Sequence, residues 1–472
     1  MKPAAQRVLS QLSGRLDPGA ILAGEAVDAR YGDDLSGIPG ARPELVLRPR
    51  DTRGVAEALR ACNAAGQTLV VQGGRTGLCG GARTLSGEAV LSLERMTRLE
   101  AVEPMAATII AEAGVPLQAV QEAADTAGLC FGVDIGARGT ATIGGNVATN
   151  AGGIRVLRYG TFRAQVLGLE VALADGSVLS SMKGLAKDNS GYDLNQLFIG
   201  SEGTLGVVTR ACLRLHPKPV SQAAAWCALP SLDAALSLLK LLRARLGNLL
   251  GGFEILFEPL VGDMAAALGI TPPLPVSSPV HVLADIQGMA PGVDEEAFAA
   301  VLGEALESGL ARDVVLSQSP REYQALWALR DECNRFLFSL PPMVGLDVSV
   351  PLPRMGAFLE EAEATARRID PACVIYVFGH LGDGNLHYMV GAERPEAVTK
   401  ALFVCLAGLG GAITAEHGVG LDKRAYLPLV RSADEIAAMR RLKAAFDPEN
   451  ILNPGRVFDM VPAGRVAPGV PA

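Results

Sequence analysis

Three of the five histidines lie close together in the sequence, beside acidic residues. The segment HLGDGNLH (380–387) places His380 and His387 on either side of a Gly-Asp-Gly-Asn turn, which predicts a hairpin that brings the two imidazoles together. Glu416 and His417 follow further along the chain. Two imidazoles and one carboxylate suit a divalent ion such as Zn²⁺ and leave one coordination position open for a substrate oxygen. We therefore expect His380, His387 and Glu416 to bind a metal; the alternative is a polar hairpin with ordinary histidines.

The remaining groups of this region have other predicted roles. Adjacent residues of an extended segment point to opposite sides, so Glu416 can face the metal while His417 faces elsewhere. His417 is the predicted general base, because an imidazole with a pKa near 6.5 accepts a hydroxyl proton at neutral pH. Asp383 is expected to shape the turn rather than bind the metal. His216 and Tyr388 are expected to be structural.

Three glycine-rich segments predict a site for a long polar ligand. GGRTGLCGG (73–81) directly follows the strand-like TLVVQ, and successive backbone N–H groups in such a loop can converge on an anion. The segment lacks the Walker and Rossmann fingerprints. The segments 134–160 and 200–209 repeat the pattern with Gly, Thr and Asn. One dinucleotide lying along all three segments explains them together, whereas three unrelated turns is the alternative. We expect residues 134–160 to wrap this ligand and not to form a conventional core element.

The motifs QGGRTGLCGG, TIGGNVATNAGG, LRYG, LGLEVALADG and KDNSGYDLNQLFIGSEGTLG resemble the FAD domain of the vanillyl-alcohol-oxidase-type flavoproteins, also called PCMH-type. From about Glu44 to Phe458 the chain is most similar to the D-2-hydroxyglutarate dehydrogenase branch; the D-lactate dehydrogenases and glycolate oxidase subunits are more distant. The resemblance implies bound FAD. The first 215 residues contain no His and Cys79 lacks a companion, so we expect the FAD to be non-covalent. The residues expected to bind FAD are Gln72, Gly73, Gly74, Arg75, Thr76, Gly77, Leu78, Gly80, Asp134, Gly136, Thr142, Gly145, Asn146, Thr149, Asn150, Gly152, Glu202, Gly203, Gly206, Val207 and Asn453.

The resemblance also bears on the metal and the substrate. In the D-2-hydroxyglutarate dehydrogenases, the positions that match His380, His387 and Glu416 bind a divalent metal, usually zinc. The position that matches His417 is the base in those enzymes. Arg330 matches the arginine that holds the substrate carboxylate, which a guanidinium can bind bidentately. Asn453 matches a residue that closes over the flavin.

Three substrate positions depart from the family pattern. The family's threonine is Asn334 here, its lysine is Gly345 and its asparagine is Met389. Glycine leaves space and methionine is apolar and adaptable. The resemblance therefore implies intact metal, base and flavin machinery with a less polar pocket for the substrate tail.

The elements that must position these residues are those of an α+β protein. Strand signals at 44–49, 68–72, 89–93 and 107–112, a hairpin at 166–180 and a strand at 206–217 predict a two-part PCMH-type FAD-binding domain over residues 1–218. A substrate-binding cap with an antiparallel sheet and helices is expected at 219–410. A helical C-terminal segment, 411–472, is expected to complete the site, with a loose end in its last dozen residues.

Composition excludes several classes of protein. The chain has 472 residues and a net charge of −8, from 42 Lys and Arg against 50 Asp and Glu, without a long basic run. We therefore expect no nucleic-acid partner. No apolar run reaches the roughly 18 residues of a spanning helix. The first residues have some transit-peptide character but no secretory h-region. Eight scattered cysteines without a CxxC pair indicate reduced thiols and a cytoplasmic protein.

Together these features predict an FAD- and divalent-metal-dependent D-2-hydroxyacid dehydrogenase that produces a 2-oxoacid. The expected partners are a small 2-hydroxyacid and an electron acceptor such as an electron-transfer flavoprotein or a quinone, and a homodimer is possible. Two alternatives stay open at this point: a flavin oxidase that uses O₂, and an electron-transfer flavoprotein subunit with a vestigial substrate site.

Overall fold

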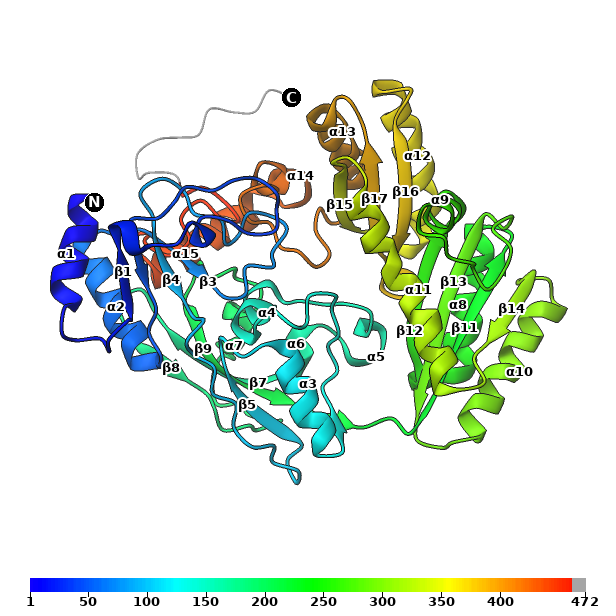
Figure 1. Ribbon diagram of the computed structural model, residues 1–472, viewed down its shortest axis with the longest axis horizontal. Helices are drawn as coiled ribbons and strands as arrows, with labels where there is room; N and C mark the ends of the chain where they lie inside the picture. Colours follow the sequence, from blue (N-terminus) through cyan, green and yellow to red (C-terminus); the bar gives the residue numbers. More distant parts are fainter. Residues whose placement is uncertain (461–472) are drawn as a thin grey trace.

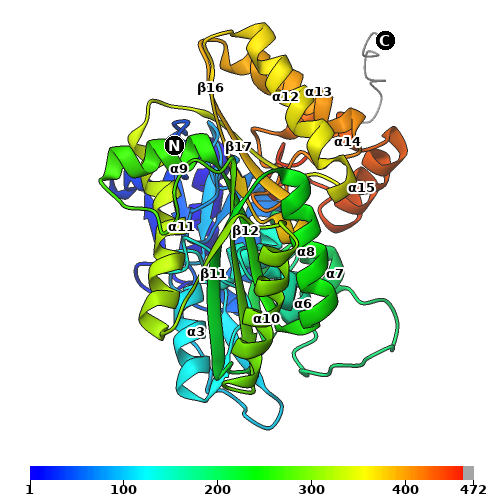
Figure 2. The same cartoon turned by 90° about the vertical axis from the view of Figure 1, so that its right-hand side faces the viewer.

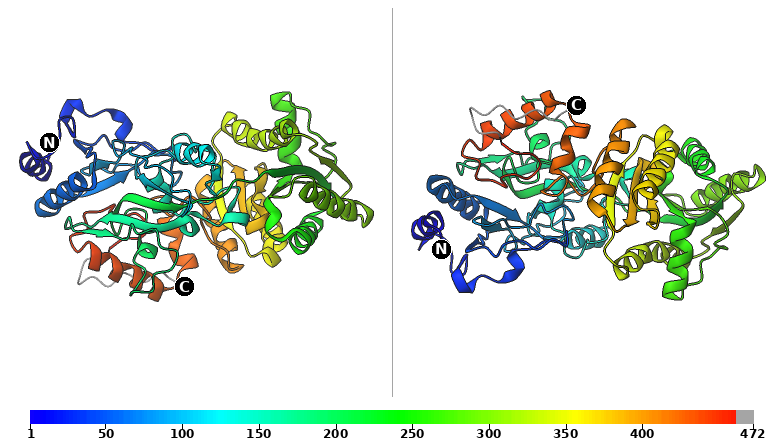
Figure 3. Two further views of the ribbon diagram at one scale, coloured as in Figure 1. Left: turned by 90° about the horizontal axis from the view of Figure 1, so that it is seen from below. Right: turned by 90° about the horizontal axis from the view of Figure 1, so that it is seen from above.

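The computed structural model describes residues 1–460 as two halves that lie side by side along the long axis of the molecule (Figure 1; Figure 3). Both halves combine helices with sheets, which confirms the expected α+β class. The last dozen residues, expected to be a loose end, lie outside the described residues. Within the described part, no helix is long and apolar enough to cross a membrane.

The first half contains a four-stranded sheet of order β1-β2-β4-β3, in which β2, β4 and β3 are parallel. Helix α2 begins after Asp51, whose carboxylate accepts the Gly54 N–H, and ends at the left-handed Gly66. These caps place the helix between the two expected strands that it connects. The elements are α1 (Pro3–Leu12), β1 (Ile21–Ala23), β2 (Leu45–Leu47), α2 (Thr52–Ala65), β3 (Leu69–Gln72) and β4 (Ala89–Ser92).

A second, antiparallel sheet of order β5-β9-β7-β8 completes the first half. The predicted hairpin around Asp175 and Gly176 is confirmed, because Glu170 pairs with Ser180 across it. The elements are β5 (Thr108–Glu112), α3 (Leu117–Thr126), β6 (Leu129–Cys130), α4 (Ile143–Thr149), α5 (Val156–Tyr159), α6 (Phe162–Gln165), β7 (Val166–Ala172), β8 (Val178–Ser180), α7 (Asn195–Phe198), β9 (Val207–Arg214) and β10 (His216–Pro217), where β10 pairs with β6.

The glycine-rich segment 134–160 differs from the expectation that it forms no core element. Helix α4 is part of the core: Ile143 and Val147 are fully buried. Glycine makes this possible, since a Cβ on Gly144 would lie 2.6 Å from the Cβ of Ala113. The segment therefore combines a buried helix with loops that face the ligand.

The second half is built on a seven-stranded antiparallel sheet. Strand β11 has the sequence SQAAAWCAL, and its alanines carry little strand signal, so the sequence did not predict it. In sheet order the strands are β14 (Asp313–Leu316), β11 (Ser221–Leu229), β13 (Val280–Gly288), β12 (Leu250–Phe257), β16 (Val374–Gly379), β17 (Asn385–Gly391) and β15 (Val344–Ser349).

Helices cover both faces of this sheet (Figure 2). One core packs α8 (Leu232–Leu246), α10 (Val293–Glu307), α12 (Met355–Ile369) and α13 (Pro395–Gly408) on one face, and the other packs α9 (Glu258–Leu268) and α11 (Pro320–Ser339) on the opposite face. Successive strand residues point to opposite faces. Because Leu256, Phe378 and Met389 belong to the core under α11, this alternation places Glu254 and His387 on the same side.

The C-terminal segment returns to the first half, where α14 (Leu427–Val430) and α15 (Ala433–Phe446) lie (Figure 1). Leu452 forms a parallel bridge with Leu69 of β3. The buried Lys443 ammonium donates to the carbonyl oxygens of Thr204 and Leu452 and pairs with Asp447. These contacts fix the segment that carries Asn453 against the glycine-rich loops.

Candidate active site

A cleft of about 1870 Å³ is lined by residues of both halves. This exceeds the roughly 300–1,000 Å³ of a pocket for one drug-sized ligand. The loops around Gly74 and Gly203 and helix α4, which carries Gly145, supply one part of the lining, and α11 with strands β15–β17 supplies another. The cleft therefore has room for a dinucleotide and a substrate together.

The glycine-rich segment 134–160 offers unused polar atoms to this cleft. Thr142 Oγ1 and Asn146 Nδ2 are buried and have no hydrogen-bond partner in the described protein. A Cβ on Gly73 would lie 2.4 Å from Thr142 Oγ1, and one on Gly74 would lie 2.0 Å from the Thr140 carbonyl oxygen. Side chains at these positions would displace the neighbouring loop, so glycine keeps the backbone close. Unpartnered donors in a cleft of this size fit a bound FAD.

Three of the residues expected to bind FAD do not line the cleft. Gln72 is fully buried and donates to the carbonyl oxygens of Tyr31 and Ala82, at 2.9 and 2.8 Å. Asn150 is the left-handed cap of α4 and accepts the Arg163 N–H. Gly80 is also absent from the lining. The residues that do line it are Gly73, Gly74, Arg75, Thr76, Gly77, Leu78, Asp134, Gly136, Thr142, Gly145, Asn146, Thr149, Gly152, Glu202, Gly203, Gly206, Val207 and Asn453.

Glu202 and Asn453 use their side chains to tie segments together. The Glu202 carboxylate accepts the N–H groups of Val419 and Gly420, at 2.7 and 2.8 Å. Asn453 accepts the Val71 N–H at 2.8 Å and donates to the Glu202 carbonyl oxygen at 2.7 Å. Both residues face the cleft, yet their polar atoms hold the loops in place.

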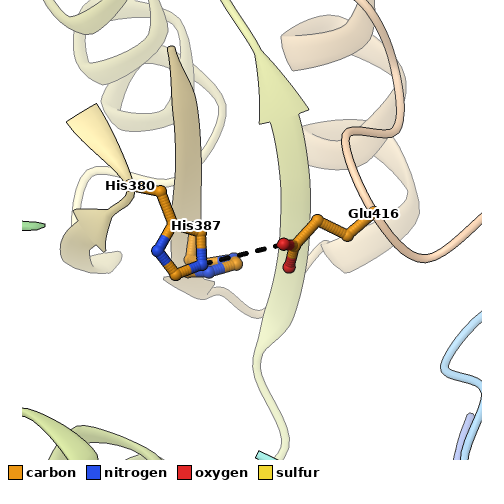
Figure 4. Close-up of side chains that lie close together, drawn as sticks. All are labelled: His380, His387 and Glu416. Carbon is orange, nitrogen blue, oxygen red and sulfur yellow. Dashed lines mark ion pairs between the residues drawn. The ribbon is translucent and has the colours of Figure 1, made fainter. Parts of the chain in front are cut away.

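His380, His387 and Glu416 converge in one place (Figure 4). One ligand atom from each lies within 4.8 Å of the other two, and His380 Nε2 lies 3.8 Å from Glu416 Oε1. A tetrahedral zinc site with bonds of about 2.0–2.2 Å separates its ligand atoms by roughly 3.3–3.6 Å. Because a small adjustment meets this spacing, the three residues fit a divalent cation. Asp383 stays outside the group and accepts the Asn385 N–H within its turn.

Burial and neighbouring charges shift the pKa values of His380 and His387 in opposite directions. Burial and the charge of His380 lower the pKa of His387 to about 3. Burial also acts to lower the pKa of His380, but the Glu254 charge outweighs it and raises that pKa to about 9. Binding a cation requires His380 to lose its proton, because only a neutral imidazole coordinates a metal.

Asp347 faces His417, the predicted base. The sequence reasoning did not assign Asp347 a role. Its Oδ2 lies 3.5 Å from His417 Nδ1 and accepts the N–H groups of Glu416 and His417, at 2.9 and 3.1 Å. Burial favours a neutral carboxyl, but the charges of His417 and Lys423 outweigh it and lower the pKa of Asp347. A lone Asp within the apolar run VGLDVSV was the signal for this role.

Arg330 lies in the cleft lining, but part of its guanidinium is already engaged. Its Nε and Nη2 atoms both lie 2.9 Å from Glu254 Oε2. Glu254 is a second residue that the sequence reasoning missed, although it is a lone carboxylate in GGFEILF. The Nη1 end of Arg330 has no partner among the described residues.

Two of the three departures from the family pattern, Gly345 and Met389, face each other. Gly345 on β15 pairs with Met389 on β17, and Asp347 pairs with His387 two residues along. A Cβ on Gly345 would lie 3.2 Å from Met389 Cε. Met389 and Asn334 both line the cleft. The methionine therefore occupies the space that a longer side chain at position 345 would need.

Cys79, His216 and Tyr388, which the sequence analysis also considered, have environments that fit structural roles. Burial raises the pKa of the Cys79 thiol to about 12, which leaves it a poor nucleophile. His216 Nε2 lies 2.8 Å from Gln165 Oε1. Tyr388 is buried in the core with Phe358. All eight cysteines are free.

Residues 218–457 match the family described as FAD linked oxidases, C-terminal domain, and residues 43–181 match the FAD binding domain family. The chain is 38% identical to a mitochondrial D-2-hydroxyglutarate dehydrogenase of Bos taurus, over 94% of this chain and 82% of that protein. It is 39% identical to a D-2-hydroxyglutarate dehydrogenase of Xanthomonas citri pv. viticola, over 92% of this chain and 94% of that protein.

The fold is that of p-cresol methylhydroxylase. A structure of that enzyme with bound substrate superimposes with a TM-score of 0.78, covers 98% of both chains and shares 15% of the sequence. The expected PCMH-type fold is thereby confirmed. The chain therefore belongs to the family of FAD-linked oxidoreductases that includes the D-2-hydroxyglutarate dehydrogenases.

Proposed function

We propose that this protein is an FAD- and divalent-metal-dependent dehydrogenase that oxidises a D-2-hydroxyacid to the 2-oxoacid, with the hydride passing to flavin N5. The observation that supports it most is the meeting of His380, His387 and Glu416 beside His417 in a cleft shared with the glycine-rich loops. An electron-transfer subunit has no need of this histidine and carboxylate group, which disfavours that alternative.

Each proposed role follows from the position of the side chain. Arg330 binds the carboxylate next to the reacting carbon. His417, with Nδ1 directed at Asp347, takes the hydroxyl proton at Nε2. His380, His387 and Glu416 hold the cation. When bound, the flavin supplies a hydride acceptor and the cation supplies a Lewis acid.

The substrate tail is proposed to be less charged than that of D-2-hydroxyglutarate. Gly345 and Met389 replace two polar partners, and Met343 and Phe378 also line the cleft. A buried carboxylate without a partner costs several kcal/mol. Aliphatic or aromatic tails, as in D-lactate and D-mandelate, should therefore compete with dicarboxylates.

Anaerobic reduction of the FAD-loaded protein tests the proposal. D-2-Hydroxyglutarate, D-malate, D-lactate and D-mandelate are each added, and loss of the flavin band near 450 nm is followed. Reduction by D isomers and not by L isomers supports the proposed function, and no reduction by any of them contradicts it. A preference of about a hundredfold or more for D-2-hydroxyglutarate, worth roughly 2.7 kcal/mol, would contradict the proposed tail.

The fate of the reduced flavin separates dehydrogenase from oxidase. Slow reoxidation by air and fast reoxidation by an electron-transfer flavoprotein or a quinone analogue support the dehydrogenase. Fast reoxidation by O₂ with hydrogen peroxide release supports the oxidase. We also propose an electron-transfer flavoprotein or a quinone as the electron acceptor, a homodimer and a cytoplasmic location; the Bos taurus relative is named mitochondrial.

A further inference from the structure

One buried carboxylate joins the proposed metal site to the proposed substrate arginine. Glu254 lies on β12 and is 1% exposed. Its Oε1 lies 2.7 Å from His380 Nδ1, and its Oε2 accepts from Nε and Nη2 of Arg330, both at 2.9 Å. No other acidic side chain among residues 1–460 forms an ion pair with Arg330. Both oxygens of Glu254 are therefore committed to residues with proposed roles in the reaction.

We propose that Glu254 is a positioning residue that fixes His380 for metal binding and selects the edge of Arg330 that meets the substrate carboxylate. This inference rests on the function proposed above. Glu254 is not among the residues that line the cleft, so it acts through its two partners.

The first effect concerns the imidazole of His380. A carboxylate that accepts Nδ1–H leaves the lone pair of the neutral ring on Nε2 and fixes the orientation of the ring. Nε2 is the atom that lies 3.8 Å from Glu416 Oε1, on the side of the cation site. Glu254 thus selects the tautomer that can coordinate a metal.

The second effect concerns the guanidinium of Arg330. An arginine presents one edge through Nε and Nη2 and another through Nη1 and Nη2. Glu254 occupies the first edge. A substrate carboxylate must therefore bind at the Nη1/Nη2 end, which narrows the directions from which a 2-hydroxyacid can approach His417.

Glu254→Gln tests the first effect by a measurement that does not depend on turnover. The amide has one acceptor atom, so it cannot accept from His380 and Arg330 with separate oxygens. If the amide NH₂ of Gln faces His380 Nδ1, the imidazole carries its hydrogen on Nε2. In that tautomer Nε2 has no lone pair with which to bind a cation. In competition with a chromogenic chelator, the FAD-loaded E254Q protein should bind Zn²⁺ about 10- to 100-fold more weakly than wild type.

The second effect predicts a change in KM at saturating Zn²⁺. With the best D-2-hydroxyacid of the panel, E254Q should raise KM about tenfold or more, because Arg330 loses its fixed edge. Asp285→Asn is the matched control. Asp285 is a fully buried carboxylate that binds Arg155 and Tyr323, and in the described structure it forms no hydrogen bond or ion pair with His380 or Arg330. It should leave both the Zn²⁺ affinity and KM near wild type.

The outcomes separate this inference from the proposed function. Wild-type Zn²⁺ affinity and KM in E254Q would overturn the inference, as would an equal loss in D285N. If E254Q does not retain FAD, Glu254→Asp is measured instead. The shorter side chain cannot reach both partners, so unchanged values in E254D would overturn the inference equally. A wild-type protein that no D-2-hydroxyacid reduces would instead overturn the proposed function.

Discussion

At the scale of single residues, the site depends on carboxylates that orient imidazoles. Asp347 binds the backbone of the segment that carries Glu416 and His417, and it also faces His417 Nδ1. Glu254 Oε1 likewise faces Nδ1 of His380, at 2.7 Å. His380 and His417 thus each direct Nδ1 at a carboxylate and leave Nε2 available.

Replacing His417 by alanine should remove the proposed base while leaving the cofactors in place. We expect the rate of anaerobic flavin reduction to fall about 10²- to 10⁴-fold, the usual range for loss of a general base. Stopped-flow absorbance measures the rate, and flavin and metal contents serve as controls. Reduction at the wild-type rate would exclude His417 as the base.

The facing pair Gly345 and Met389 predicts a change of specificity. The double variant G345K/M389N restores the side chains that the family pattern has at these positions, and we expect kcat/KM for D-2-hydroxyglutarate to rise about tenfold or more. G345K alone should gain less, because a Cβ at 345 would lie 3.2 Å from Met389 Cε. Steady-state kinetics on both variants check this. Equal gains in the single and double variants would contradict the steric argument.

The buried thiol of Cys79 predicts a flavin that is not covalently attached. Its pKa is raised to about 12 by burial, so little reactive thiolate is present at neutral pH. Acid precipitation should therefore release all FAD into the supernatant, as measured by its absorbance. Flavin that stays with the pellet would show the prediction to be wrong.

At the scale of elements, the cleft is shaped by loops that bind one another. Asn453 connects β3 to the loop after Ser201 through two hydrogen bonds. Glu202 extends this connection to residues 419 and 420. The C-terminal segment thus holds the glycine-rich loops in the arrangement that lines the cleft.

Asn453→Ala should loosen this arrangement. It leaves the Val71 N–H and the Glu202 carbonyl oxygen without partners, and each such buried group costs about 1–3 kcal/mol. We expect a lower Tm and faster loss of FAD, followed by fluorescence of the released flavin. Asn63→Ala is the control, because the Asn63 amide oxygen has no partner to lose. Equal effects of the two substitutions would contradict the proposed role.

At the scale of the whole molecule, the two halves contribute different parts of one site. The glycine-rich loops belong to the first half, whereas His380 and His387 belong to the seven-stranded sheet of the second. Glu416 and His417 come from the C-terminal segment that returns to the first half. We therefore expect turnover to require both halves, and the proposed FAD and metal to use separate sets of residues.

Removal of the metal should consequently leave FAD bound. We expect chelation to abolish turnover, to leave the 450 nm absorbance with the protein and to be reversed by Zn²⁺. Elemental analysis should find one equivalent of metal before chelation. Full activity after chelation, or well under one equivalent in active protein, would contradict the assignment of His380, His387 and Glu416.

The sequence alone determined the features that depend on local chemistry. Short side chains in the segments around Gly74, Gly145 and Gly203 indicated a dinucleotide site. Such segments leave backbone N–H groups free to converge on an anion. The Gly-Asp-Gly turn between His380 and His387 indicated that two imidazoles meet. The hairpin at Asp175 was likewise a local signal.

Only the tertiary structure decided the features that depend on strand register and on competition for hydrogen bonds. Neighbouring strands place Gly345 opposite Met389 and Asp347 opposite His387, although these pairs are far apart in the sequence. Gln72 lies in a matching motif yet donates to the protein backbone, because a buried amide takes the nearest acceptors. The proposed role of Glu254 depends on β12 lying beside β16. Such long-range partners are set by packing, which no local pattern records.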